Sequence, residues 1–273
     1  MVATDIRKEA RESLKNKWVK AALIILIQFL ITGLLTGIEK ALGDNSTLTA
    51  IISIIEVIIG IPLSFGMVAV FIKLKRNEEV NYFDFIKIGF DNFTRAWGLC
   101  FRTLLKMILP IICVILAIII VSIMFAAGGI AGIAMGAGQQ ALGLVIIGII
   151  IYVAALAYAV TIGLKYALTV CIAYDNPDMT TQDAVEKSAE LMVGHRGDLF
   201  VLLLSFLGWA LLCYLPIILA TACILVPVLA IIFMIGAVCG VLCLGAYIQM
   251  ARICFYDDVL KLNSEKTTVE VQE

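Results

Sequence analysis

Two long stretches without a charged residue constrain this chain more than any other feature of its sequence. They cover residues 107–164 and 199–251, and each is far longer than the roughly 20 apolar residues that cross a bilayer as a helix. Hydrophobic residues make up 62% of the 273 residues and charged residues only 15%, whereas about 25% of a soluble domain is charged. The chain is therefore predicted to be an all-α, polytopic membrane protein.

Each charge-free stretch is long enough for two helices joined by a turn, and two further apolar runs precede them. The second of those runs is interrupted by one ionisable residue, Glu56. We predict six transmembrane helices in one integral membrane domain over residues 1–262, followed by a disordered cytoplasmic tail over 263–273. The predicted spans are 19–38, 48–72, 107–127, 141–164, 199–219 and 224–250.

The distribution of lysine and arginine predicts the orientation. Nineteen of the twenty lie before or near the start of span one, in the connections after spans two and four, or after span six, and the exception is Lys40. Because basic loops stay in the cytoplasm, both termini are predicted to be cytoplasmic. The first apolar run lacks the small-residue cleavage pattern of a signal peptide, so we expect it to be retained as a span.

Composition and motif content argue against several classes of function. The net charge of −1 and the low charged fraction exclude a disordered chain and a nucleic-acid-binding domain. One histidine and eight scattered cysteines without a CxxC pair argue against a metal or haem site, so no cofactor is predicted. Walker-A, GxGxxG, GxSxG and HExxH patterns are absent. No catalytic residues are predicted, and we expect that the protein is not an enzyme.

An aromatic amphipathic segment lies between spans two and three. Aromatic residues and Ile86 recur there at spacings of three to four residues, which predicts one apolar face on a helix over 81–97. Such a cytoplasmic helix lies in the headgroup layer, so its aromatic residues are predicted to anchor the bundle, with a binding surface as the alternative. The predicted anchors are Tyr82, Phe90, Phe93 and Trp97.

Segments of the same plan precede span one and span five. In the latter, Thr180 and Asp183 have the spacing of a helix N-cap pair. The three segments align without gaps, which predicts three parallel units, each an interfacial helix followed by a hairpin of two spans. Chance similarity between amphipathic helices is the alternative. The aligned positions include Asp5, Asp84 and Asp183, and also Ala10, Gly89 and Ser188.

Glu56 is an ionisable residue inside a predicted span, about 12 Å from its outer end at 1.5 Å per residue. Groups at such depth usually face the bundle interior or water, so we interpret Glu56 as a candidate proton- or cation-linked site. The alternatives are a protonated carboxyl hydrogen-bonded to a neighbouring helix, or a side chain that reaches the outer headgroups. Its candidate polar neighbours are Gln28, Tyr152 and Tyr158.

Glycines recur four residues apart, among them Gly33 with Gly37 and Gly236 with Gly240. This spacing lets helices approach closely and indicates packing inside the bundle, with a homo-oligomer as the alternative. The glycine-rich segment 128–138 is expected to form a flexible outer loop or a re-entrant piece.

Several motifs, taken in order, resemble those of a known family. Over nearly its whole length the chain resembles a bacterial integral membrane family labelled domain of unknown function 975, which is distantly similar to the membrane part of certain glycerophosphodiester phosphodiesterases. The resemblance implies a bacterial cytoplasmic membrane location, and it brings no catalytic or binding residues. The motifs are IRKEARESL at 6–14, DNP at 175–177, ELMVGHR at 190–196, LSFLGW at 204–209 and FYDD at 255–258.

These observations predict a non-enzymatic accessory or structural component of the membrane. Its interfacial helices and apolar spans point to membrane lipid, a protein partner or a second copy of the chain as the binding partner. The alternative function is a small permease or exporter with Glu56 in its path.

Overall fold

The computed structural model describes residues 3–42, 46–135, 138–222 and 226–270, and all regular structure in these ranges is α-helical. The short helices are α1 (Ala3–Ser13), α4 (Asp84–Asp91), α7 (Thr169–Asp175), α8 (Thr181–Leu191) and α9 (Arg196–Leu204). The long helices are α2 (Trp18–Ala41), α3 (Ser46–Lys75), α5 (Phe93–Met135), α6 (Gly138–Lys165), α10 (Leu207–Ala222) and α11 (Pro227–Glu270).

Six segments among the described residues are long and apolar enough to cross a membrane, which confirms the predicted number. Four of them lie within single long helices, and the fourth in chain order runs from α6 through the turn at 166–168 into α7. The fifth in chain order joins α9 and α10 across a break at Ser205, whose hydroxyl bonds the carbonyl of Leu202. The segments are Trp18–Ala41, Thr47–Lys75, Phe93–Ala126, Ile146–Asp175, Arg196–Thr221 and Pro227–Glu265.

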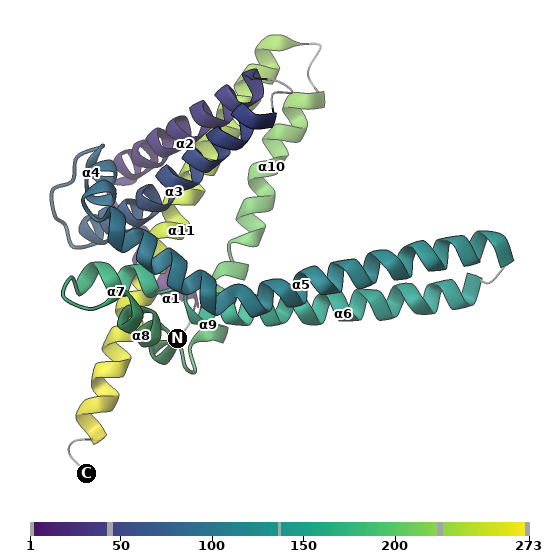
Figure 1. The fold of residues 1–273 in the computed structure, drawn as a ribbon. Helices are drawn as coiled ribbons and strands as arrows, with labels where there is room; N and C mark the ends of the chain where they lie inside the picture. The colour runs from purple at the N-terminus through teal and green to yellow at the C-terminus, as the bar shows by residue number, and fades with distance from the viewer. Residues whose placement is uncertain (1–2, 43–45, 136–137, 223–225, 271–273) are drawn as a thin grey trace.

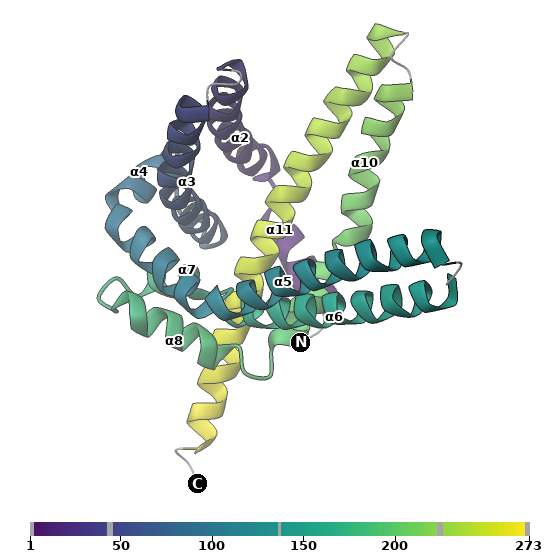
Figure 2. The same cartoon turned by 45° about the vertical axis from the view of Figure 1, so that its right-hand side comes forward.

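The long helices form three hairpins that diverge from a common centre. These are α2 with α3, α5 with α6, and α10 with α11, and Figures 1 and 2 show them pointing in three different directions. The chain's N-terminus lies at the centre, while α11 continues past it to the C-terminus (Figure 1). The molecule therefore consists of three hairpins that are joined at one end and separate at the other.

A compact core lies where the three hairpins meet. We call this part the base; it comprises α1, α4, α7 and α8, residues 63–75 of α3 and residues 246–259 of α11. Its buried side chains include Phe71, Phe85, Ile172, Phe255 and Tyr256. Away from the base the hairpins stay apolar yet exposed, as for Phe125 at 67% and Ile123 at 62%. Such surface is stable only in an apolar medium, as expected for a membrane protein.

The packing follows the register of the predicted repeat. Each short helix packs on the helix that ends the preceding unit: α4 packs on α3 and α8 packs on α7. The helix α1 of the first unit packs on α11, which ends the third unit. The aligned inward positions are buried in all three units, which chance similarity would not require. They are Ile6, Phe85 and Ala184, followed one turn later by Ala10, Gly89 and Ser188.

The predicted helix over 81–97 is wrong as a single element. It is two helices, because the backbone leaves helical geometry at Asn92 (φ −106°, ψ 25°) and α5 begins at Phe93. The Asn92 side-chain amide donates to the carbonyl of Ile88 at 2.9 Å, and the same carbonyl accepts the backbone N–H of Asn92 at 3.2 Å. Tyr82 precedes α4, so it does not share a helix with Phe93 and Trp97.

Two further boundaries differ from those predicted. Residues 263–270 continue α11 instead of forming a disordered tail, since extending an existing helix adds one hydrogen bond per residue and needs no new nucleus. Residues 271–273 lie outside the described residues. The glycine-rich segment is helical through Met135, and residues 136–137 of it also lie outside the described ranges.

Candidate functional site

Glu56 lies in the α2–α3 hairpin and is hydrogen-bonded within it. The Thr36 hydroxyl donates to Glu56 Oε1 at 3.3 Å, and in the same hairpin the Ser53 hydroxyl donates to Glu39 Oε1 at 3.0 Å. The side chain of Glu56 is half-buried. This geometry matches the interpretation of a carboxyl bonded to a neighbouring helix.

The structure does not gather the other three candidate polar residues around Glu56. Tyr152 and Tyr158 lie on α6, at 37% and 41% exposure, in the hairpin that diverges from α2 and α3 (Figures 1 and 2). Gln28 lines a separate cleft between α2, α10 and α11, and Glu56 does not line it. The sequence thus identified one residue of the cleft described next.

That cleft has a volume of about 690 Å³, within the roughly 300–1,000 Å³ of ordinary ligand pockets. Most of its wall is apolar and includes Ile217 on α10 and Val241 on α11. Its polar side chains include Gln249 and Arg252, which lie one turn apart near the base end of α11, Gln28 and Thr32 on α2, and Tyr214 on α10. We call this space the Arg252 cleft.

Arg252 also lines a second cavity, of about 400 Å³, bounded by α3, α5 and the segment that follows α6. Its guanidinium donates to the carbonyl of Ala167 at 3.4 Å. Among the described residues, no aspartate or glutamate lines either cavity or pairs with Arg252. This arginine is therefore a positive charge without a counter-charge, set between apolar hairpins.

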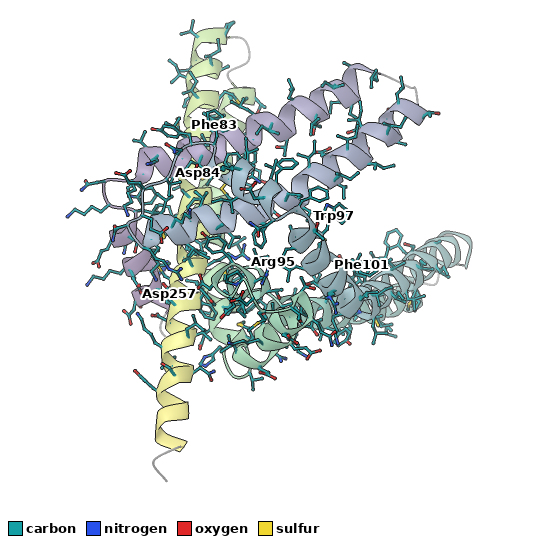
Figure 3. All side chains as sticks on the ribbon, turned by 60° about the vertical axis from the view of Figure 1, so that its left-hand side comes forward. Phe83, Asp84, Arg95, Trp97, Phe101 and Asp257 are labelled. Atoms are coloured by element: carbon teal, nitrogen blue, oxygen red, sulfur yellow. The ribbon has the colours of Figure 1, made fainter. Side chains whose placement is uncertain are left out.

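The base holds a second polar feature, an ionic network that joins the three units. Lys75, at the end of α3, pairs with Glu9 of α1 at 3.0 Å and with Asp257 of α11 at 2.7 Å. Its side chain is only 11% exposed. Figure 3 shows Asp257 on α11 within the base.

The neighbouring ion pair continues this network to α7. Arg76 donates to Asp175 at 2.7 Å, and the hydroxyl of the buried Tyr256 donates to the same carboxylate at 3.1 Å. The hydrogen bond from Arg76 to Asp175 raises the pKa of the arginine above its ordinary value. Sequence reasoning missed this network. Its only signal is the Tyr-Asp pair that ends α7 and recurs at 256–257, opposite two adjacent cations at 75–76.

The start of α5 is fixed to the segment before α8 by Arg95. Its guanidinium donates to the carbonyls of Asn176 at 2.6 Å and Met179 at 2.9 Å, and also to that of Pro177. Figure 3 shows Arg95 and Trp97 in the first turns of α5. The arginine thus supplies hydrogen-bond donors to the carbonyls of the turn that leads into α8, one of which, that of Asn176, also accepts the backbone N–H of Met179 at 3.1 Å.

Three of the predicted aromatic anchors, Phe90, Phe93 and Trp97, remain neighbours despite the break at Asn92. The rings of Phe90 and Phe93 have centroids 6.3 Å apart, and those of Phe93 and Trp97 are 6.5 Å apart. Tyr82, Phe90 and Phe93 are exposed, whereas Trp97 is half-buried. The stacked rings of Phe90 and Phe93 thus form an exposed apolar surface where α4 meets α5.

The fold and these sites define an all-α, polytopic membrane protein with six candidate spans. A family model described as "Protein of unknown function (DUF975)" matches residues 1–263. The chain belongs to this family. No curated protein and no solved structure matches it.

Proposed function

We propose that this protein is a non-enzymatic component of the bacterial cytoplasmic membrane that binds lipid between its hairpins. The observation that carries the proposal is the divergence of three exposed, apolar hairpins from one compact base. Helices in lipid gain no hydrophobic energy by packing together, so acyl chains fill the space between such hairpins. The protein would thereby hold a local group of lipids around a fixed cytoplasmic platform.

The orientation in this proposal has the base and both termini in the cytoplasm. It is supported by nineteen of twenty lysine and arginine residues on the base side of the spans. The exposed rings of Tyr82, Phe90 and Phe93 at the rim of the base suit the inner headgroup layer. The bacterial origin, and the distant likeness to the membrane part of phosphodiesterases, rest on the resemblance of the motifs.

Native mass spectrometry of the protein released from mild detergent tests the proposal. We expect the folded protein to keep phospholipid from its host membrane through repeated detergent exchange. A folded protein that emerges free of lipid would refute lipid binding. The resemblance alone would then remain as a guide to function.

A permease that uses Glu56 is the alternative function. It has weaker support, because Glu56 is hydrogen-bonded inside its own hairpin and does not line the Arg252 cleft. Proton flux into reconstituted vesicles, followed with an internal pH-sensitive dye, distinguishes the two. Lipid binding alone predicts no flux from wild type or from Glu56→Gln. Flux that Glu56→Gln abolishes would replace our proposal with transport.

A further inference from the structure

We infer that the Arg252 cleft binds the phosphate of an anionic phospholipid, whose acyl chains lie along the apolar walls of α2, α10 and α11. This inference rests on the proposed lipid-binding function and specifies its ligand and its site.

The charge of the cleft selects an anion. Arg252 is its only cation among the described lining residues, and no described carboxylate lines it. A guanidinium among apolar walls is costly unless an anion neutralises it. Its contact with the neutral carbonyl of Ala167 is long, at 3.4 Å, and leaves most of its donors for a ligand. A planar guanidinium binds phosphate oxygens with two parallel hydrogen bonds.

Two amides line the same cleft as this charge. Gln249 is on the same side of α11 as Arg252, and Gln28 faces the cleft from α2. Within the described part of the chain, neither side-chain amide has a hydrogen bond to protein. Amide NH₂ groups donate to phosphate and ester oxygens. Three side chains from two hairpins are thus available to one headgroup.

The shape of the cleft selects an amphiphile over a soluble anion. From Arg252 the cleft extends along α11 to Val241, and α10 adds Ile217 to its apolar wall. The charge of the cleft is at its base end, and the wall farther out is mostly apolar, with Thr32 and Tyr214 as its polar side chains. A phospholipid of the inner leaflet has this order of polar and apolar parts, whereas inorganic phosphate would leave the apolar wall uncovered.

Native mass spectrometry with added phosphatidylglycerol tests the assignment, with Arg252→Gln as the principal variant. We expect the variant to retain the lipid about tenfold less well than wild type, the effect of losing one strong charge-assisted contact. Arg252→Lys keeps the positive charge but loses the two parallel N–H donors of the guanidinium, so its lipid retention should fall between those of wild type and Arg252→Gln. Arg102→Gln makes the same charge change at a residue that lines neither cavity and bonds Gln182; it should match wild type.

A second variant tests the site without changing Arg252, in case Arg252→Gln does not fold. Ala210→Phe places a ring in the cleft from α10 and should displace the lipid with no change in charge. Thermal unfolding without added lipid shows whether each variant is folded. Equal retention by folded wild type, Arg252→Gln and Ala210→Phe would overturn the inference while leaving general lipid binding intact.

Two further measurements distinguish an anionic phospholipid from other ligands that carry a phosphate. Phosphatidylcholine, whose phosphate is neutralised by choline, should bind more weakly than phosphatidylglycerol. Inorganic phosphate at millimolar concentration should not displace the bound lipid. If it displaces the lipid completely, the site belongs to a soluble phosphate, and the lipid assignment is wrong. If wild type retains no lipid of any kind, the proposed function itself fails.

Discussion

Gly66 and Gly89 decide how closely α4 lies on α3. A Cβ on Gly66 would be 1.8 Å from the carbonyl oxygen of Phe85, and one on Gly89 would be 2.3 Å from that of Pro62. Both obstacles are backbone atoms, which cannot move aside as a flexible side chain can. The close contact of these two helices therefore requires glycine at both positions, and the sequence spacing had drawn attention to other glycines.

Gly66→Ala should destabilise the protein by about 1–3 kcal/mol or more, the cost of inserting a methyl group into a filled interface. Thermal unfolding in detergent measures the loss. Gly60→Ala is the matched control on the same helix, because nothing lies within 4 Å of its added Cβ; it should be neutral or slightly stabilising, since alanine favours a helix. Equal melting temperatures for the two variants would show that α4 does not pack on α3 as described.

Lys75 is the residue on which the base network depends. Lys75→Met leaves the carboxylates of Glu9 and Asp257 facing each other without a cation, and should cost about 1–3 kcal/mol of unfolding free energy. Adding Asp257→Leu to this variant should cost less than the sum of the single changes. Lys73→Met on the same helix is the control, because among the described residues Lys73 forms no ion pair. If the loss of unfolding free energy in the double variant equals the sum of the losses in the two single variants, Lys75 and Asp257 do not pair directly.

Among the elements, α8 has the clearest local start signal. The Thr180 hydroxyl accepts a hydrogen bond from the backbone N–H of Asp183 at 3.2 Å, which confirms the predicted N-cap. The corresponding start of α4 differs, since there Asp84 accepts from the backbone N–H of Asn81 at 2.8 Å and no side chain caps the helix from its N-cap residue. The two helices thus begin with different halves of a capping box.

Thr180→Ala should weaken α8 by about 1 kcal/mol, because a backbone donor loses its acceptor. Faster hydrogen exchange at the first amides of α8 would report this loss, while Thr180→Ser should keep wild-type protection. Unchanged exchange in the alanine variant would show that packing on α7 and α5 holds the start of α8 without the cap.

For the whole molecule, the decisive arrangement is one base from which three hairpins diverge, and the proposed orientation puts this base in the cytoplasm. Epitope tags at either terminus should be digested by protease in inverted vesicles and protected in intact spheroplasts. A tag inserted between α2 and α3 should show the reverse pattern. Digestion of a terminal tag in intact spheroplasts would place that terminus outside and refute the orientation.

The sequence by itself determined the class of protein, the six spans and the cap of α8. Hydropathy is a sum of local transfer free energies, and a cap involves residues only three apart, so both are readable along the chain. The inward positions of the three short helices were readable for the same reason, through their shared register of Ala10, Gly89 and Ser188.

Only the tertiary structure decided which of these elements meet. Lys75 pairs with residues of α1 and α11, and Arg252 lies between hairpins that are distant in sequence. Neither the pairing of Lys75 nor the position of Arg252 produces a periodic pattern in the sequence, because each depends on how three hairpins converge on one base. Glu56 illustrates the converse: its depth in a span was evident from sequence, but its hydroxyl partner on α2 depended on how that hairpin packs.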